Sequence, residues 1–262
     1  MGTRPEMIKM WSVLKKLDNS NFDHLMVHTS QNFTKELKDF FFEDLELRKP
    51  DFDLKIDTSS YGKEVADVIY KSEKLFKKVK PDALIILGDT YSGLSVLPAN
   101  NLGIKIFHME AGLRAWDKRM PEQTNRRLID HISDILLPFN NYHRENLIRE
   151  DIHPSKIFVT GNPTFEVLDA FQEKIESSDI MNKLSLKKQS YILVTAHRKE
   201  NVDDKFSFQS ILDGLRGAIK GIVDGFVGSF VSIIGSALYI GGGIASTVKG
   251  PDTLVIPLTI SG

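Results

Sequence analysis

The sequence contains no cysteine, which excludes disulfide bonds, thiolate metal ligands and a cysteine nucleophile. Neither charge is in excess, because 34 lysines and arginines stand against 35 aspartates and glutamates and leave a formal net charge of -1. A chain without a positive field has no general attraction for a polyanion, so nucleic acid is not expected as a partner. The lack of cysteine also fits a reducing cytosol.

Signals for export, metal binding and dinucleotide binding are lacking too. Arg4, Glu6 and Lys9 interrupt the first residues and no apolar run follows them, so we expect no signal peptide and a cytoplasmic location. The histidines are scattered without the spacing of metal ligands. No GxGxxG motif follows an apolar run, so NAD is not indicated. The sequence therefore predicts no cofactor and no metal.

The first two hundred residues alternate short apolar runs with helical patterns, which is typical of βαβ units and a parallel sheet. Apolar spacings of three and four predict helices over 5–17 and 62–79, and a third helix is expected to begin at Pro121. The strands expected are Leu25–Thr29, Ala83–Leu87, Lys105–Met109, Asp134–Pro138, Lys156–Thr160 and Tyr191–Thr195. This order predicts an α/β fold.

Composition divides the chain into a first domain over 1–171, a polar linker and helix over 172–189, and a second domain over 190–262. Glycine occurs 7 times before residue 206 and 11 times from there on, so an atypical tail begins near that point. Within the tail, 225–248 carries no charge and is long enough to span a membrane. Three consecutive glycines and moderate hydrophobicity weigh against a span.

Opposed charges are dense over 108–126, directly after a predicted strand. Ligands of open α/β sheets bind beyond the carboxyl ends of the strands, so this segment is a candidate site. The plainer interpretation is a solvated loop with salt bridges. Three further polar blocks lie at or just after apolar runs, namely GTRPEMIK at 2–9, LGDTYSG at 87–93 and TAHRKEN at 195–201.

In this order and at this spacing, the four blocks and the GNP segment at 161–163 resemble the non-hydrolysing UDP-N-acetylglucosamine 2-epimerases. The resemblance runs from Gly2 to about Asp204. It implies two Rossmann-like domains of the glycosyltransferase-B type and, if the chain is intact, a homodimer. It also implies a cofactor-free conversion of UDP-N-acetylglucosamine to UDP-N-acetylmannosamine, by elimination and re-addition of UDP, in the supply of surface polysaccharide precursors.

The sequence departs from the family's pattern at both ends. The family has a strand before the Gly-Thr-Arg turn, whereas only Met1 precedes Gly2 here. The family's second domain holds UDP with a Ser-Gly-Gly and paired-glutamate segment and a Thr-Glu-Arg-Pro segment, and neither is found. We therefore expect a fold that lacks the first strand and has a truncated or replaced second domain.

The resemblance also assigns site residues. Asp89, Glu110 and Glu122 match the family's three acid/base carboxylates, and His197 matches a histidine near the leaving diphosphate. The substrate-binding residues implied are Arg4, Lys9, Arg114, Asn125, Arg126 and Arg198. Epimerisation through elimination needs a base on one face of the sugar, an acid on the other and cations near the diphosphate, and these residue types supply all three.

Each carboxylate also has a structural interpretation. Asp89 could cap the helix that follows it, Glu122 could favour the positive end of its helix, and Glu110 could pair with Arg114. Three other functions stay open at this stage. The chain could act on a dideoxy or diacetamido UDP-sugar, it could hydrolyse UDP-N-acetylglucosamine, or it could be an inactive fragment tethered to a membrane by its tail.

Overall fold

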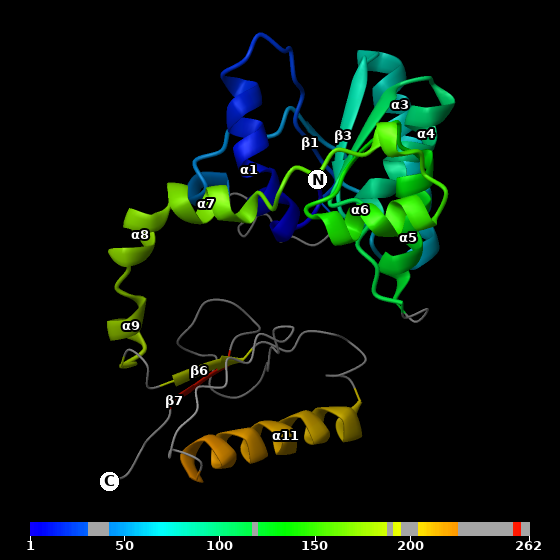
Figure 1. Ribbon diagram of the computed structural model, residues 1–262. Helices are drawn as coiled ribbons and strands as arrows, with labels where there is room; N and C mark the ends of the chain where they lie inside the picture. The colour runs from blue at the N-terminus through cyan, green and yellow to red at the C-terminus, as the bar shows by residue number, and fades with distance from the viewer. Residues whose placement is uncertain (31–41, 117–119, 188–190, 195–203, 225–253, 258–262) are drawn as a thin grey trace. The chain divides into compact units, whose positions relative to one another are not determined.

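The computed structural model describes residues 1–30, 42–116, 120–187, 191–194, 204–224 and 254–257. It divides into two compact units, Met1–Gln172 and Glu173–Gly262, which are drawn in Figure 1. The first unit is an α/β arrangement with parallel strands, as the alternating pattern predicts.

The first unit contains a three-stranded parallel sheet in the order β3-β4-β5. β3 (Ala83–Leu87) and β4 (Lys105–Met109) have the predicted bounds, and β5 (Ile135–Leu137) is shorter than expected. Leu87 pairs with Met109, and Met109 pairs with Leu137. The carboxyl ends of the three strands are therefore level.

A second, two-stranded parallel sheet joins β1 (Val27–His28) to β2 (Phe52–Asp53). β1 is the core of the strand expected over Leu25–Thr29. The sequence gives no sign of β2, because two residues are too few to show an alternation. The segment expected as a strand over Lys156–Thr160 is not assigned as one. It does run beside β5, because Ile157 forms an isolated parallel bridge with Leu136, and Phe158 N and Thr160 N donate to Leu136 O and Pro138 O at 2.9 and 3.1 Å.

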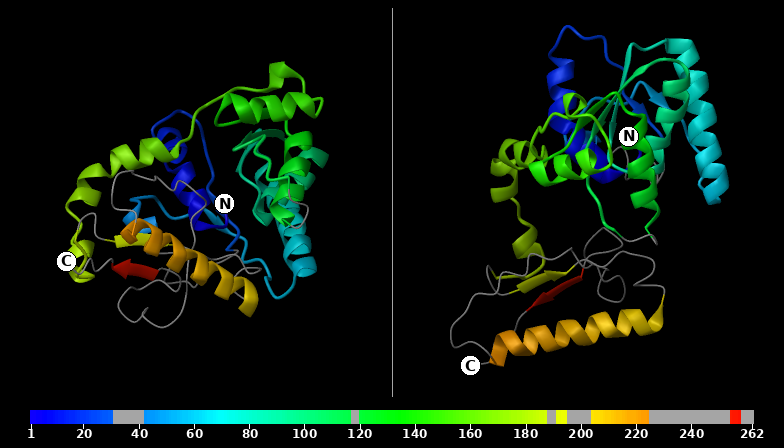
Figure 2. Two further views of the ribbon diagram at one scale, coloured as in Figure 1. Left: turned by 60° about the horizontal axis from the view of Figure 1, so that its bottom comes forward. Right: turned by 45° about the vertical axis from the view of Figure 1, so that its right-hand side comes forward.

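Helices lie on both sides of the strands. The predicted helices are found as α1 (Arg4–Asp18), α3 (Tyr61–Val79) and α5 (Pro121–Ile132), and Pro121 occupies a first-turn position as expected. The others in this unit are η1 (Tyr91–Ser95), α4 (Val96–Asn101), α6 (Asn141–Arg149), η2 (Pro154–Lys156) and α7 (Thr164–Ala170). Figures 1 and 2 show α1 on one side of β3 and α3 on the other.

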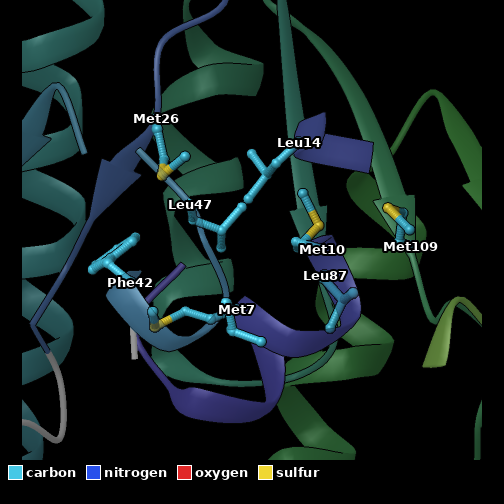
Figure 3. Close-up of a cluster of buried hydrophobic side chains, with 9 residues drawn as sticks. Met7, Met10, Leu14, Met26, Phe42, Leu47, Leu87 and Met109 are labelled. Atoms are coloured by element: carbon cyan, nitrogen blue, oxygen red, sulfur yellow. The ribbon is translucent and has the colours of Figure 1, made fainter. Parts of the chain in front are cut away.

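Alternation along β3 explains this two-sided packing. Leu87 joins the cluster formed by Met7, Met10 and Leu14 of α1, and Figure 3 shows these side chains facing one another. Ile86, which points to the opposite face, packs in a cluster with residues of α3, α4 and α5. Both faces of the sheet are therefore buried, which is the usual state of a parallel sheet.

The first residue is held beside β1. The amino group of Met1 donates to Val27 O at 3.0 Å, and Thr29 N donates to Met1 O at 2.9 Å. In the part of the chain that the structure describes, no ladder joins the β1-β2 sheet to the β3-β4-β5 sheet. The two sheets are connected through the α1 cluster, which also includes Met26.

The described residues of the second unit, taken by itself, form short helices, one longer helix and one strand pair. α8 (Gln172–Glu176) begins at the last residue of the first unit and is followed by α9 (Ile180–Lys183), and both lie in the predicted polar segment. β6 (Tyr191–Val194) pairs antiparallel with β7 (Leu254–Pro257). α11 covers Lys205–Asp224. No helix among the described residues is long and apolar enough to cross a membrane, and 225–248 lies outside them.

Gly112 illustrates the tight packing behind the sheet. Its φ of 76° is in the left-handed region, and a Cβ there would collide with the backbone oxygen of His143. We expect Gly112→Ala to lower the free energy of unfolding by about 3 kcal/mol or more. The cost of the left-handed φ for alanine adds to the cost of the clash with the backbone of His143. Gly103 also has a left-handed φ of 72° but faces open space, so Gly103→Ala should cost only about 1 kcal/mol. Urea unfolding of both variants measures the difference, and equal losses would contradict the packing described.

Candidate active site

Two loops meet where β3 and β4 end. Gly88 N donates to Met109 O at 3.0 Å, and Glu110 N donates to Leu137 O at 3.1 Å, so each strand continues its pairing one residue past its end. Asp89 and Glu110 are thereby brought to one edge of the sheet. This is the edge at which parallel α/β sheets present their functional groups.

Glu110 lies between two cations. Lys9 Nζ is 2.5 Å from Glu110 Oε2, and Arg126 Nη2 is 3.4 Å from Glu110 Oε1. The same Arg126 nitrogen also pairs with Asp89 Oδ2. Four predicted residues from α1, α5 and two strand ends thus form one chain of charges in the order Lys9, Glu110, Arg126, Asp89. The expected pairing of Glu110 with Arg114 is wrong.

Burial makes this charge chain electrostatically significant. Glu110 is 7% exposed and Arg126 is 4% exposed. Charges that are shielded from water interact more strongly than surface pairs. Glu110 also has a φ of 64°, which is unusual for a residue with a side chain. Such strained residues cluster at functional sites, where the surrounding structure holds them in place.

Asp89 is a carboxylate whose titration is shifted by its surroundings. Burial raises the pKa of Asp89 above its ordinary value, and Arg126 acts in the opposite direction. The charges of Glu110 and Glu122 raise this pKa further. The side chain of Asp89 pairs with Arg126 instead of capping the following helix, where Thr90 occupies the N-cap position. A carboxyl group that holds its proton more readily is suited to donate it.

The first turns of α5 support Asp89. Asn125 Nδ2 donates to the backbone oxygen of Asp89 at 3.0 Å. Gln123 Oε1 accepts from Ala115 N at 2.9 Å and so holds the loop that follows Glu110. Glu122 is exposed in the first turn of α5, where the helix dipole favours an acidic residue. The charge of Glu122 also raises the pKa of Asp89. Glu122 can therefore favour the start of its helix and act as one of the acid/base carboxylates at the same time.

Arg114 lies in a buried charge network. Its guanidinium pairs with Asp130 Oδ2 at 2.8 Å and with Glu150 Oε2 at 2.6 Å, and its side chain is fully buried. Asp130 Oδ1 is 2.8 Å from His108 Nδ1, while His108 Nε2 donates to Gly88 O at 2.8 Å. Arg114 is therefore part of a buried network that supports the loops from behind. Its predicted role as a pocket residue stays a prediction.

Three further predicted site residues are not part of the charge chain. They are Arg4, His197 and Arg198. Arg4 is the first residue of α1 and is exposed. His197 and Arg198 fall in 195–203, outside the described residues, so their roles stay predictions. Among the residues that the structure does describe, no group of three His, Asp or Glu side chains could hold a metal ion.

Two residues near the cluster were not singled out from the sequence. Glu6 is 3% exposed and accepts hydrogen bonds from the chain start and from Thr90 Oγ1. A Thr-x-x-Glu capping pattern at 3–6 could have drawn attention to it. His143, near the start of α6, has a buried Nδ1 without a hydrogen-bond partner in the described structure. Burial and the charge of Arg126 lower its pKa, and nothing in the local sequence indicates this.

A hollow of about 330 Å³ lies between α1 and α7, apart from this cluster. It is lined by Trp11, Ser12, Lys15, Lys16, Asn19 and Glu166. None of the predicted site residues lines it. The convergence of buried charges is therefore a better guide to the site than this hollow.

Comparison with known proteins identifies the same family as the motifs. The sequence profile of the UDP-N-acetylglucosamine 2-epimerase family matches residues 15–223. A UDP-N-acetylglucosamine 2-epimerase of Methanocaldococcus jannaschii is 37% identical over 222 residues, which are 82% of this chain and 60% of that protein. A UDP-2,3-diacetamido-2,3-dideoxy-D-glucuronate 2-epimerase of Pseudomonas aeruginosa is 34% identical, with 82% of this chain and 61% of that protein covered.

A solved structure supports the fold. The M. jannaschii enzyme in complex with UDP-GlcNAc and UDP matches with a TM-score of 0.77 and 36% identity, covering 85% of this chain and 62% of that one. The predicted fold class, α/β of the glycosyltransferase-B type, is confirmed. The chain spans about three fifths of the length of the curated relatives it matches.

The buried network predicts a pH dependence of stability. Hydrogen bonds from Arg114, aided by Arg127, lower the pKa of Glu150 from 4.5 to about 2 against the opposing effect of burial. A carboxylate with a lowered pKa adds stability above its unfolded pKa near 4.5, and this contribution is lost as pH falls toward 2. Glu150→Gln should therefore reduce the free energy of unfolding at pH 7 by at most about 3 kcal/mol.

The deficit of Glu150→Gln relative to the native protein should shrink as pH falls from 4.5 to 2, which urea titrations at each pH would measure. Glu145→Gln is the matched control, because Glu145 is half-exposed and pairs with Arg144 on the surface. A deficit at Glu150 that is the same at pH 2 and pH 7 would contradict the pairing with Arg114.

Proposed function

Because the chain belongs to the UDP-N-acetylglucosamine 2-epimerase family, we propose that it carries the acid/base half of a site for 2-epimerisation of a UDP-N-acetylhexosamine. The sugar change proposed is UDP-N-acetylglucosamine to UDP-N-acetylmannosamine. The observation that carries this proposal is the charge chain of Lys9, Glu110, Arg126 and Asp89 at the carboxyl ends of β3 and β4.

The C2 proton of the sugar is too weakly acidic for simple removal, since the neighbouring group is an acetamide and not a carbonyl. In the reaction proposed, a carboxylate takes this proton while the C1–O bond to UDP breaks. The electron pair of the C–H bond forms a C1=C2 double bond, and UDP leaves with the electrons of the C1–O bond. UDP then adds back to C1 while C2 receives a proton on its other face, which inverts C2.

The geometry suits Glu110 and Asp89 to these proton transfers. Glu110 is paired with two cations, which hold its carboxylate in place at the strand end, where a base can be positioned. Asp89, with its raised pKa, is the better donor. Two carboxyl groups joined through one arginine can hold different protonation states, as acid/base catalysis requires. Glu122, at the exposed start of α5, is the third candidate.

Lys9 and Arg4 are proposed to face the diphosphate. Both belong to the amino-terminal part of α1, where the positive end of the helix dipole favours anions. Lys9 Nζ is partly exposed, with 27% of its side chain accessible, so an anionic ligand can reach it. A diphosphate bound there would draw Lys9 from Glu110 and leave that carboxylate free to act. The roles of His197 and Arg198 remain predictions of the family resemblance.

A diacetamido UDP-sugar is the second candidate substrate. It is supported by the 34% identity to the P. aeruginosa enzyme, which has nearly the same coverage as the M. jannaschii enzyme. A role in polysaccharide supply, a cytoplasmic location and a homodimer remain predictions. Hydrolysis of UDP-N-acetylglucosamine and a chain without activity are outcomes that the following experiment separates.

The test is incubation of the purified 262-residue chain with UDP-N-acetylglucosamine in deuterated water, followed by proton NMR. We expect deuterium at C2 and a manno product, because protonation at C2 draws on solvent. Glu110→Gln should slow this exchange at least about 100-fold, since a positioned acid or base contributes that much. Glu166→Gln, which alters an exposed pair with Lys16, should leave the exchange unchanged.

Release of free amino sugar would indicate the hydrolysing reaction. Exchange only with a diacetamido UDP-sugar would establish the second candidate. A folded chain that exchanges no substrate, or a Glu110→Gln variant that exchanges as fast as the native chain, would overturn the proposal.

A further inference from the structure

Glu6 is a buried carboxylate with donors on both of its oxygens. Glu6 Oε2 accepts from Gly2 N at 2.5 Å, from Thr3 N at 2.8 Å and from Thr3 Oγ1 at 3.2 Å. Glu6 Oε1 accepts from Thr90 Oγ1 at 2.6 Å. A carboxylate that is 3% exposed is costly to bury, and hydrogen bonds from several donors offset that cost.

The two sets of donors belong to different parts of the site. Gly2 and Thr3 form the turn that leads into Arg4 and, one helical turn later, Lys9. Thr90 follows Asp89 directly at the end of β3. Thr90 and Glu6 are 84 positions apart in the sequence, so their hydrogen bond fastens the cationic segment to the loop that carries the acid.

We propose that Glu6 and Thr90 are positioning residues. Their hydrogen bond sets the distance between the cations of α1, which are proposed to bind the diphosphate, and the acid/base carboxylates at the strand ends. This inference rests on the function proposed above. Neither side chain belongs to the charge chain itself, so the pair acts through the residues beside it. A displacement of about 1 Å between reacting groups can cost up to about 100-fold in rate, which is why such a fastening matters.

The alternative is that Glu6 merely stabilises the start of α1. The two roles are carried by different oxygens and can therefore be separated. The bonds from Gly2 and Thr3 satisfy N–H groups at the start of the helix, and they do not involve Thr90. Removal of the Thr90 hydroxyl deletes no donor to Oε2, but it releases Oε1 from the Asp89 loop. The carboxylate is then held on one side only, so its bond to the Thr3 amide should open more often.

Thr90→Val is the decisive variant, because valine has the same shape and no hydroxyl. Thr29→Val is its matched control. Thr29, directly after β1, has its Oγ1 2.8 Å from Ser92 Oγ in η1, so this variant removes a nearby hydroxyl contact without touching Glu6. Thr90→Ser restores the hydroxyl and should behave as the native chain does.

We expect Thr90→Val to lower kcat for C2 exchange about 10-fold with little change in KM, whereas Thr29→Val and Thr90→Ser keep the native kcat. Hydrogen exchange gives a readout that needs no activity. The Thr3 amide, which bonds to Glu6, should exchange at least about 3-fold faster in Thr90→Val and at the native rate in Thr29→Val.

Equal effects of Thr90→Val and Thr29→Val on kcat, or native exchange at Thr3 in Thr90→Val, would overturn the positioning role. A native chain without epimerase activity would instead remove the proposed function. Hydrogen exchange at the Thr3 amide would still show whether Thr90 holds the turn. Failure of the proposed function can therefore be distinguished from failure of the positioning role.

Discussion

The pairing of buried carboxylates with more than one cation or donor is the constraint on which this site depends. Glu110 and Asp130 are both buried, and an isolated charge in either place would be prohibitively costly. Glu110 is balanced by Lys9 and Arg126, while Asp130 is balanced by Arg114 and lies beside His108. Since the partners come from different helices and strand ends, satisfying the charges also fixes the elements that carry them.

The charges form two layers with different exposure. The front layer joins α1 to the ends of β3 and β4, and it includes the partly exposed Lys9 and Asp89. The rear layer contains Arg114, Asp130 and His108, whose side chains are fully buried. A fully buried rear layer behind an accessible front layer holds Asp89 and Glu110 in place without closing them off from a ligand, as the proposed proton transfers require.

Much of the sheet and of the front layer could be predicted from the sequence. β3 is an uninterrupted apolar run and β4 is a largely apolar one that includes Lys105 and His108. The bounds of both are read from the sequence, so the polar groups that follow them are expected at strand ends. β2 is too short to show a period. The segment over Lys156–Thr160 has a strand's composition and donates backbone hydrogen bonds to Leu136 and Pro138. Only an isolated bridge forms, because a regular ladder depends on how the neighbouring strand continues, which composition does not specify.

The ion-pair and hydrogen-bond partners of the charged residues were harder to predict than their places on helices and strand ends. Arg114 lies four residues after Glu110, and proximity along the chain suggested a pair, whereas the fold directs its guanidinium to Asp130 and Glu150. Thr90 and Glu6 are far apart in sequence, so no local pattern reveals that they touch. Long-range pairing is decided by how the helices pack on the sheet, which the order of residues alone does not state.

The most direct measurement of the central claim, that Asp89 and Glu110 form one electrostatically coupled site, is a carboxyl carbon NMR titration of Asp89 in the native chain and in Glu110→Gln. The account predicts that the native pKa of Asp89 lies above its ordinary value of 3.8 and falls when the charge of Glu110 is removed. A pKa at or below 3.8 that does not respond to the Glu110 substitution would contradict it.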